Sequence, residues 1–243
     1  MLPVYAAPAF PNTIYRNERE DNKENIPPLQ VQTIALPYQP KFKKYNYPGL
    51  VIGKSAWENV AFKIVEEIPV PSLAALNQLD PFFKKNFCAN YAIFYLPKEV
   101  CYIGKNYHFT FNALETIAKS LGVPHDFSKI SKQDQVFPAP GWYALSTEPI
   151  PFSLNRFQED QFLKIVSKEF QIPNISLFCL FSLMTYSIKN IFIFGEDTFT
   201  RCGPLNATDS YLLGGFSEDG LEIKTLTSSL VSKNIGMAVQ KKL

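Results

Sequence analysis

Cys202 is the residue of this chain that could most directly carry out chemistry. It follows Arg201, and a neighbouring cation stabilises a thiolate. With His108 or His125, the two histidines of the chain, it could form the nucleophile and base of a thiol-dependent hydrolase or transferase. No spacing places either histidine near it. The pattern therefore favours the alternative, in which Cys202 is a small apolar residue at the end of a strand.

Metal and nucleotide sites have no support in the sequence. The four cysteines and two histidines follow no zinc-binding spacing. Gly214-Gly215 lacks the strand, glycine spacing and helix of a phosphate-binding loop. We therefore expect no metal and no cofactor.

Arg201 follows two acids, Glu196 and Asp197, in a segment expected to be a loop ending in Thr200-Arg201-Cys202. A loop arginine preceded by acids usually has a local partner. Arg201 is therefore expected to bond one of these carboxylates, or a loop carbonyl, and to fix the path of the chain. The alternative is that it binds a ligand.

The overall composition is that of a globular protein. The net charge of +2 over 243 residues is too small to require nucleic acid or an anionic membrane as partner. The apolar run at 175–188 is shorter than the roughly 20 residues that span a bilayer, so no membrane segment is expected. Four sparse cysteines favour free thiols in a reducing, cytoplasmic compartment. Delivery into a host cell stays open.

Three zones divide the chain. Residues 1–48 hold eight of the 19 prolines and no sustained apolar period, which predicts a flexible arm. Residues 49–140 and 141–243 are expected to form an N-terminal and a C-terminal lobe. The polar, Pro-containing stretch 123–140 is expected to be a long loop or linker between them.

The N-terminal lobe is expected to contain a strand at 50–52, a short helix at 73–79 ended by Asp80-Pro81, and a hairpin pairing 89–96 with 100–103. A helix at 113–121 should follow, opened by Thr110 or Asn112. Its apolar residues repeat at helical spacing.

The C-terminal lobe has the clearest signals. They predict a strand at 142–146, an amphipathic helix at 158–170 with Phe157 on its apolar side, and a central apolar helix at 175–188. An Asp-Gly turn predicts a hairpin joining 211–216 to 221–225. A last strand is expected at 235–239. The fold class is therefore α+β, with a mixed, largely antiparallel sheet, packed helices and a flexible N-terminal arm.

Five short motifs occur in register over residues 50–240. They are Gly53-Lys54-x-x-Trp57, Gly104-Lys105 with Thr110-Phe111-Asn112-x-Leu114, Trp142-x-Ala144-Leu145-Ser146, Thr198-x-Thr200-Arg201-Cys202, and Gly214-Gly215-Phe216-x-x-x-Gly220-Leu221. In these motifs the chain resembles an uncharacterised protein family of chlamydia-like bacteria. The resemblance implies a domain of unknown function and supplies no catalytic residue. The chain departs from the family pattern at 153–157 and after Cys202.

Function is expected to lie in binding. The sequence favours a non-enzymatic interaction module with a protein partner, of the adaptor or host-directed effector type. Its candidate binding residues are Arg201, Thr200, Arg156 and Trp142. The alternative is the thiol-dependent enzyme, with Cys202 as catalytic residue. A histidine within reach of an accessible Cys202 sulfur would favour the enzyme, and a buried sulfur would oppose it.

Overall fold

Helix α5 (Ile175–Lys189) is the centre of the molecule. In the computed structural model, which describes residues 50–60, 62–86, 90–166, 170–190, 193–194, 198–206, 209–214, 220–227 and 229–243, it is buried on every side from Ile175 to Tyr186. The Asn174 side chain accepts from the Leu177 N–H at 2.9 Å and starts the helix. Asn190, left-handed at φ 54°, ends it. The predicted apolar helix is confirmed.

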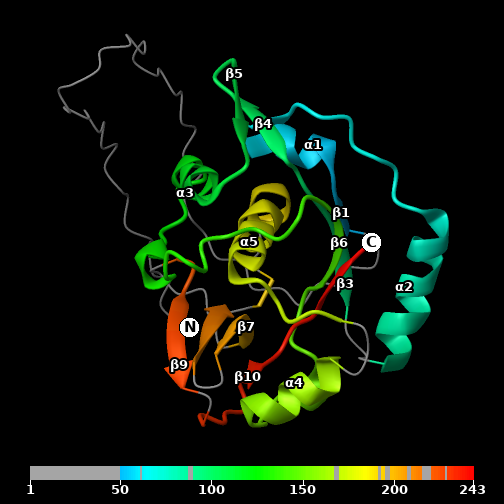
Figure 1. Cartoon of the computed structure of the whole chain (residues 1–243), viewed down its shortest axis with the longest axis vertical. Coiled ribbons are helices and arrows are strands. Elements are labelled where there is room, and N and C mark those ends of the chain that lie inside the picture. Colours follow the sequence, from blue (N-terminus) through cyan, green and yellow to red (C-terminus); the bar gives the residue numbers. More distant parts are fainter. Residues whose placement is uncertain are drawn as a thin grey trace, which may run out of the picture.

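Two four-stranded sheets surround α5 (Figure 1). The first has the order β1 (Leu50–Ile52), β3 (Tyr91–Leu96), β6 (Gly141–Ser146) and β11 (Gln240–Lys242). The second has the order β10 (Ile235–Gly236), β7 (Phe199–Asn206), β8 (Asp209–Gly214) and β9 (Ile223–Thr227). One continuous apolar core joins both sheets to α5. The predicted β8–β9 hairpin is confirmed, with Leu213 opposite Ile223.

The C-terminal segment passes from one sheet to the other. It pairs with β7 as β10 and then with β6 as β11, so the predicted single strand at 235–239 is two short strands with 237–239 between them. The backbone N–H groups of 237–239 donate in turn to the hydroxyls of Ser153, Thr200 and Ser146 at 2.8, 2.7 and 2.8 Å. These buried hydroxyls accept the hydrogen bonds of three backbone N–H groups that lie between the two short strands.

Strand β3, from the expected N-terminal lobe, pairs along six residues with β6, from the expected C-terminal lobe. Its Phe94 ring also contacts Phe181 of α5, with centroids 6.0 Å apart. The segments on either side of residue 140 therefore fold on one core. The expected arm at 1–48 lies outside the described residues.

A third, three-stranded sheet has the order β2 (Lys63–Ile64), β4 (Glu99–Tyr102) and β5 (Lys105–His108). The predicted hairpin between 89–96 and 100–103 is therefore wrong, because β4 pairs with β5 and β2 instead of β3. At the turn between β3 and β4, the Glu66 carboxylate accepts from the backbone N–H groups of Lys98 and Glu99 at 2.8 and 2.9 Å. These N–H groups are therefore satisfied by a residue far away in the sequence, which a hairpin prediction from local spacing does not include.

The remaining helices pack around α5 and the sheets. They are α1 (Lys54–Trp57), α2 (Leu73–Asn86), α3 (Phe111–Ser120) and α4 (Gln158–Val166), with single 3₁₀ turns η1 (Glu58–Val60), η2 (Phe127–Lys129) and η3 (Pro151–Ser153). Helices α1 and α3 contribute buried side chains such as Trp57 and Leu114 to the core. Thr110 is the N-cap of α3, one of the two predicted residues. The end predicted at Asp80-Pro81 is wrong. Helix α2 continues because Phe83 is buried against Tyr91 and Phe170.

Helix α4 buries two polar side chains that the sequence did not indicate. Gln158 and Gln161 are buried, while Phe157, predicted on the apolar side, is 56% exposed. The Gln161 amide donates to the Ser153 carbonyl at 2.6 Å, which satisfies this buried donor. The described residues thus form an α+β fold with mixed, largely antiparallel sheets and packed helices. None of the described helices has the length and apolarity needed to cross a membrane.

Candidate functional site

Cys202 lies inside the protein. The predicted loop at Thr200-Arg201-Cys202 is wrong, because these residues belong to β7 in the middle of the second sheet. Burial, and then the neighbouring Cys179, raise the pKa of the Cys202 thiol well above its ordinary value. The thiolate that nucleophilic catalysis needs is therefore disfavoured.

The two histidines lie in other surroundings. His108, on exposed β5, is 3.5 Å from the Glu99 carboxylate. His125 contacts the Val123 carbonyl at 2.8 Å and packs against the Phe127 ring. Neither contact involves Cys202. Cys101, Cys179 and Cys202 are free thiols, and Cys88 lies outside the described residues.

Arg201 is fully buried. Its guanidinium donates to the Ser210 hydroxyl at 3.1 Å and to the Leu230 carbonyl. Leu230 lies 29 positions away and is not part of the loop in which a local partner was expected, while Glu196 and Asp197 lie outside the described residues. Burial lowers the pKa of Arg201. The side chain joins β7, β8 and the 229–234 segment, and it has no exposed surface for a ligand.

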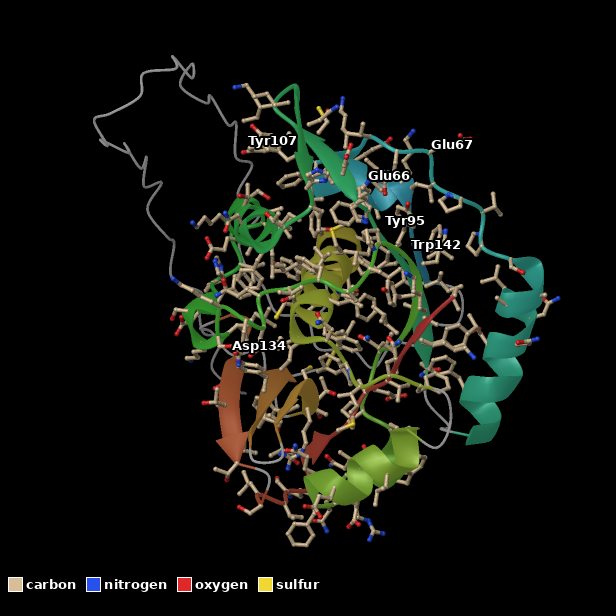
Figure 2. The ribbon with its side chains drawn as sticks, in the orientation of Figure 1. Glu66, Glu67, Tyr95, Tyr107, Asp134 and Trp142 are labelled. Atoms are coloured by element: carbon tan, nitrogen blue, oxygen red, sulfur yellow. The ribbon has the colours of Figure 1, made fainter. Side chains whose placement is uncertain are left out.

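The other candidate residues are dispersed. Thr200 is buried and accepts from the Ala238 N–H. Trp142, on the first sheet, donates to the Pro69 carbonyl and packs against Tyr95 at 5.1 Å. Arg156 is exposed just before α4. Figure 2 shows Trp142 beside Tyr95, away from β7. Within the described part of the chain, no contact joins these three residues into one site.

Pockets lie instead on the stretch Gln133–Pro140, which we call the crest loop. A pocket of about 470 Å³, the polar pocket, is lined by Gln133, Asp134, Val136, Phe137, Pro138, Gln171, Ile172, Pro173, Asn174, Gly203 and Gln240. A pocket of about 330 Å³, the aromatic pocket, is lined by Leu96, Pro97, Lys98, His108, Phe109, Thr110, Phe111, Gln135, Val136, Phe137, Pro138 and Pro140. Both include 136–138, so this short stretch is a wall between them.

Asp134 fixes the first half of the crest loop. Its carboxylate oxygen Oδ2 accepts from the hydroxyls of Tyr211 at 2.8 Å and Ser131. The Tyr211 oxygen in turn accepts from the Ser131 N–H at 3.0 Å, and Ser176 of α5 donates to the Asp134 carbonyl at 3.1 Å. Strand β8 and helix α5 therefore hold this part of the loop. Figure 2 shows Asp134 close to the sheet of β7 and β9.

The second half of the crest loop is held by three other contacts. Asn174 donates to the Val136 carbonyl at 3.1 Å, and the Tyr143 hydroxyl donates to the Ala139 carbonyl. Burial raises the pKa of Tyr143 to about 12, so this donor keeps its proton at neutral pH. The Phe137 ring packs against Phe109 at 5.0 Å. Val136 is nevertheless 58% exposed. The loop thus holds an apolar side chain in solvent on a fixed backbone.

The floor of the polar pocket is where the two large sheets meet. Gln240, next to β6, forms a backbone bridge with Gln171, and Asn174 forms one with Gly203 of β7. The Gln240 side chain accepts from the Asn174 N–H at 2.9 Å and donates to the Gln171 side chain at 3.1 Å. Gln240 is buried and fully bonded, so it builds the pocket wall.

The sequence interpretation missed these residues. Asp134, Asn174 and Gln240 carry no motif, and their partners are far away in the chain. One local signal was present. Phe137-Pro138-Ala139-Pro140 places aromatic and proline residues in a stretch otherwise assigned to a polar linker. Such a segment has few backbone conformations and little entropy to lose on ordering.

The site therefore has two neighbouring pockets that could each accept a side chain. In the described residues, no group of three or more His, Cys, Asp or Glu side chains is placed to hold a metal ion. Comparison of the chain with protein-family models, with curated proteins and with solved structures gives no match.

Proposed function

We propose that this protein is a non-enzymatic interaction module that binds an extended peptide segment of a protein partner across the crest loop. The observation that carries this proposal is the exposure of Val136 on a backbone fixed on both sides of it. An apolar side chain held rigidly in solvent gains burial on binding and loses little conformational entropy.

The two pockets support the same proposal. Each is large enough for at least one amino-acid side chain, and they share a wall at 136–138. A segment that crosses this wall would place one side chain in each pocket and cover Val136 between them. Recognition of an extended peptide by pockets for separate side chains is a common mode of binding.

The wider setting of this proposal is an adaptor or a host-directed effector in a reducing, cytoplasmic compartment. Membership in the uncharacterised family of chlamydia-like bacteria is part of the same proposal. It adds no activity, because the resemblance supplies none. No contact of Cys202 favours the alternative of a thiol-dependent enzyme, since its thiol is buried and its pKa is raised.

The test is a selection of random peptides displayed on phage, followed by affinity measurements on the enriched sequences. Val136→Asp should weaken their binding at least about 10-fold, because it places a charge where apolar contact is needed. The matched control is Val70→Asp, which makes the same change at a valine that is 91% exposed and lines neither pocket. Equal loss in both variants, or no enriched peptide, would overturn the proposal.

A further inference from the structure

The polar pocket has a single charge. Among the described residues that line it, Asp134 is the only one with an ionisable side chain, and the other polar side chains are neutral amides. In Figure 2, Asp134 and Trp142 lie on opposite sides of α5. The pocket is therefore distinct from the Trp142 region. The negative electrostatic potential inside it comes from one carboxylate, that of Asp134.

The partners of this carboxylate are neutral. Oδ2 accepts from the hydroxyls of Tyr211 and Ser131, and no ion pair of Asp134 exists within the described part of the chain. An ionised carboxylate has about four acceptor sites, and these two bonds use only part of them. Asp134 can therefore still accept a charge-assisted hydrogen bond from a cation.

The amides that face this pocket divide into two groups. Asn174 is occupied at both ends, because it caps α5 and donates to the Val136 carbonyl. Gln240 is likewise bonded through both atoms of its amide. Gln133 and Gln171 are exposed, but the Gln171 side-chain oxygen already accepts from the Gln240 amide. The groups that face a ligand in this pocket are thus the Asp134 carboxylate and the exposed amide of Gln133, which suit a donor with several N–H groups.

The aromatic pocket has the opposite preference. Phe109, Phe111 and Phe137, with flanking prolines, make its lining mostly apolar, while Lys98 and His108 supply its basic groups. A cationic side chain would lose hydration there and meet a like charge. The two pockets therefore differ in which side chain they favour, and this difference can fix the direction of a bound segment.

We infer that the partner segment carries a lysine or arginine that enters the polar pocket and pairs with Asp134, together with an apolar residue that enters the aromatic pocket. This inference rests on the proposed peptide binding and specifies the class of peptide. It also predicts that binding weakens as salt rises, because a partly exposed ion pair is screened.

The test uses the full chain and the peptides selected against it. Enriched sequences should contain Lys or Arg at a fixed spacing from an apolar residue. Replacing that basic residue with methionine should weaken binding to the wild-type protein about 10-fold. The same replacement should have little effect on binding to Asp134→Asn, in which the amide oxygen still accepts from Tyr211 and Ser131 while the charge is gone.

The outcomes separate the two proposals. Peptides that bind in a Val136-dependent way but show no basic preference and no change with Asp134→Asn would overturn this inference and leave the proposed function standing. No enriched peptide at all would overturn both. If Asp134→Asn fails to fold, Gln133→Glu replaces it, and this added charge should tighten binding of the basic peptide several-fold. Unchanged or weaker binding to Gln133→Glu would also overturn the inference.

Discussion

The crest loop and the Thr200–Cys202 stretch of β7 both place polar side chains next to the apolar core, but they differ in solvent exposure. In β7 the chemically capable groups, Arg201 and Cys202, are fully buried. In the crest loop the polar anchors are partly buried and hold Val136 in solvent. Accessibility on a fixed backbone, more than residue type, therefore distinguishes the candidate site from a structural segment.

The largest expected difference between the two regions is in thiol reactivity. Cys202 and Cys179 are buried, whereas Cys101 is partly exposed on β4. Alkylation of the native protein should modify Cys101 at least about 100-fold faster than the other two, because buried thiols react only when the structure opens. Mass spectrometry of peptides after timed iodoacetamide treatment would measure this. Fast modification of Cys202 would instead support the hypothesis that Cys202 is the nucleophile of a thiol-dependent enzyme.

Arg201→Ala should lower the free energy of unfolding by about 3 kcal/mol. It leaves a cavity and removes the donor to the Leu230 carbonyl and the Ser210 hydroxyl. Arg201→Met keeps most of the volume, so it should cost less than the alanine change. Urea unfolding of both variants gives the comparison. Unchanged stability of Arg201→Ala, with loss of peptide binding, would instead make Arg201 a binding residue.

Raising the pH above 10 should lower the free energy of unfolding, because Tyr143, which bonds the crest loop, then ionises. The pKa of Tyr143 is about 12 in the folded protein, above its ordinary value of 10.0. The folded state therefore holds this proton more tightly, and the stabilisation is complete below pH 10 and lost as pH rises towards 12. Tyr95, whose pKa is also raised to about 12, and Tyr186 lose stability in the same window, so the test is the difference between proteins. Urea unfolding should show that the loss is smaller in Tyr143→Phe than in the wild type by about 2 kcal/mol.

The control for the pH experiment is Tyr107→Phe. Tyr107 is an exposed tyrosine on β5, so its replacement should leave the dependence on pH unchanged. A steep fall of equal size in all three proteins would show that Tyr143 does not hold the crest loop through its proton.

Tyr211→Phe should have a smaller effect on stability, about 1 kcal/mol, because it removes one hydroxyl that bonds both Asp134 and the Ser131 N–H. Its effect on peptide affinity should exceed its effect on stability, since the crest loop loses its anchor to β8. Calorimetry of unfolding and of peptide binding would measure both. Affinity equal to that of the wild type would mean that this anchor does not shape the site.

Val136→Asp should change the free energy of unfolding by less than about 0.5 kcal/mol, the smallest effect in the series, because the side chain is already exposed. Val70→Asp should behave in the same way. Thermal unfolding of the two variants is the measurement. Marked destabilisation of Val136→Asp alone would indicate a structural role and remove the main support for the proposed binding site.

Predictions from local sequence patterns were correct for elements whose formation depends mainly on a single segment of the chain. The all-round apolar run of α5 and the Asp-Gly signal between β8 and β9 each predicted the observed element. Prediction failed where a distant contact decided the outcome. Glu66 bonds the backbone at the turn before β4, and Gln161 of α4 is buried with its amide bonded to the Ser153 carbonyl. A single segment does not contain these partners.

The sequence by itself determined the α+β class, the central helix and the apolar positions of the core, because helical and strand periods are local properties of the chain. The tertiary structure alone decided which polar residues became a site. Asp134, Asn174 and Gln240 acquire their roles from partners 38 to 77 positions away. Burial within the second sheet likewise removed Cys202 and Arg201 from solvent, since the side-chain environment depends on the packing of all layers.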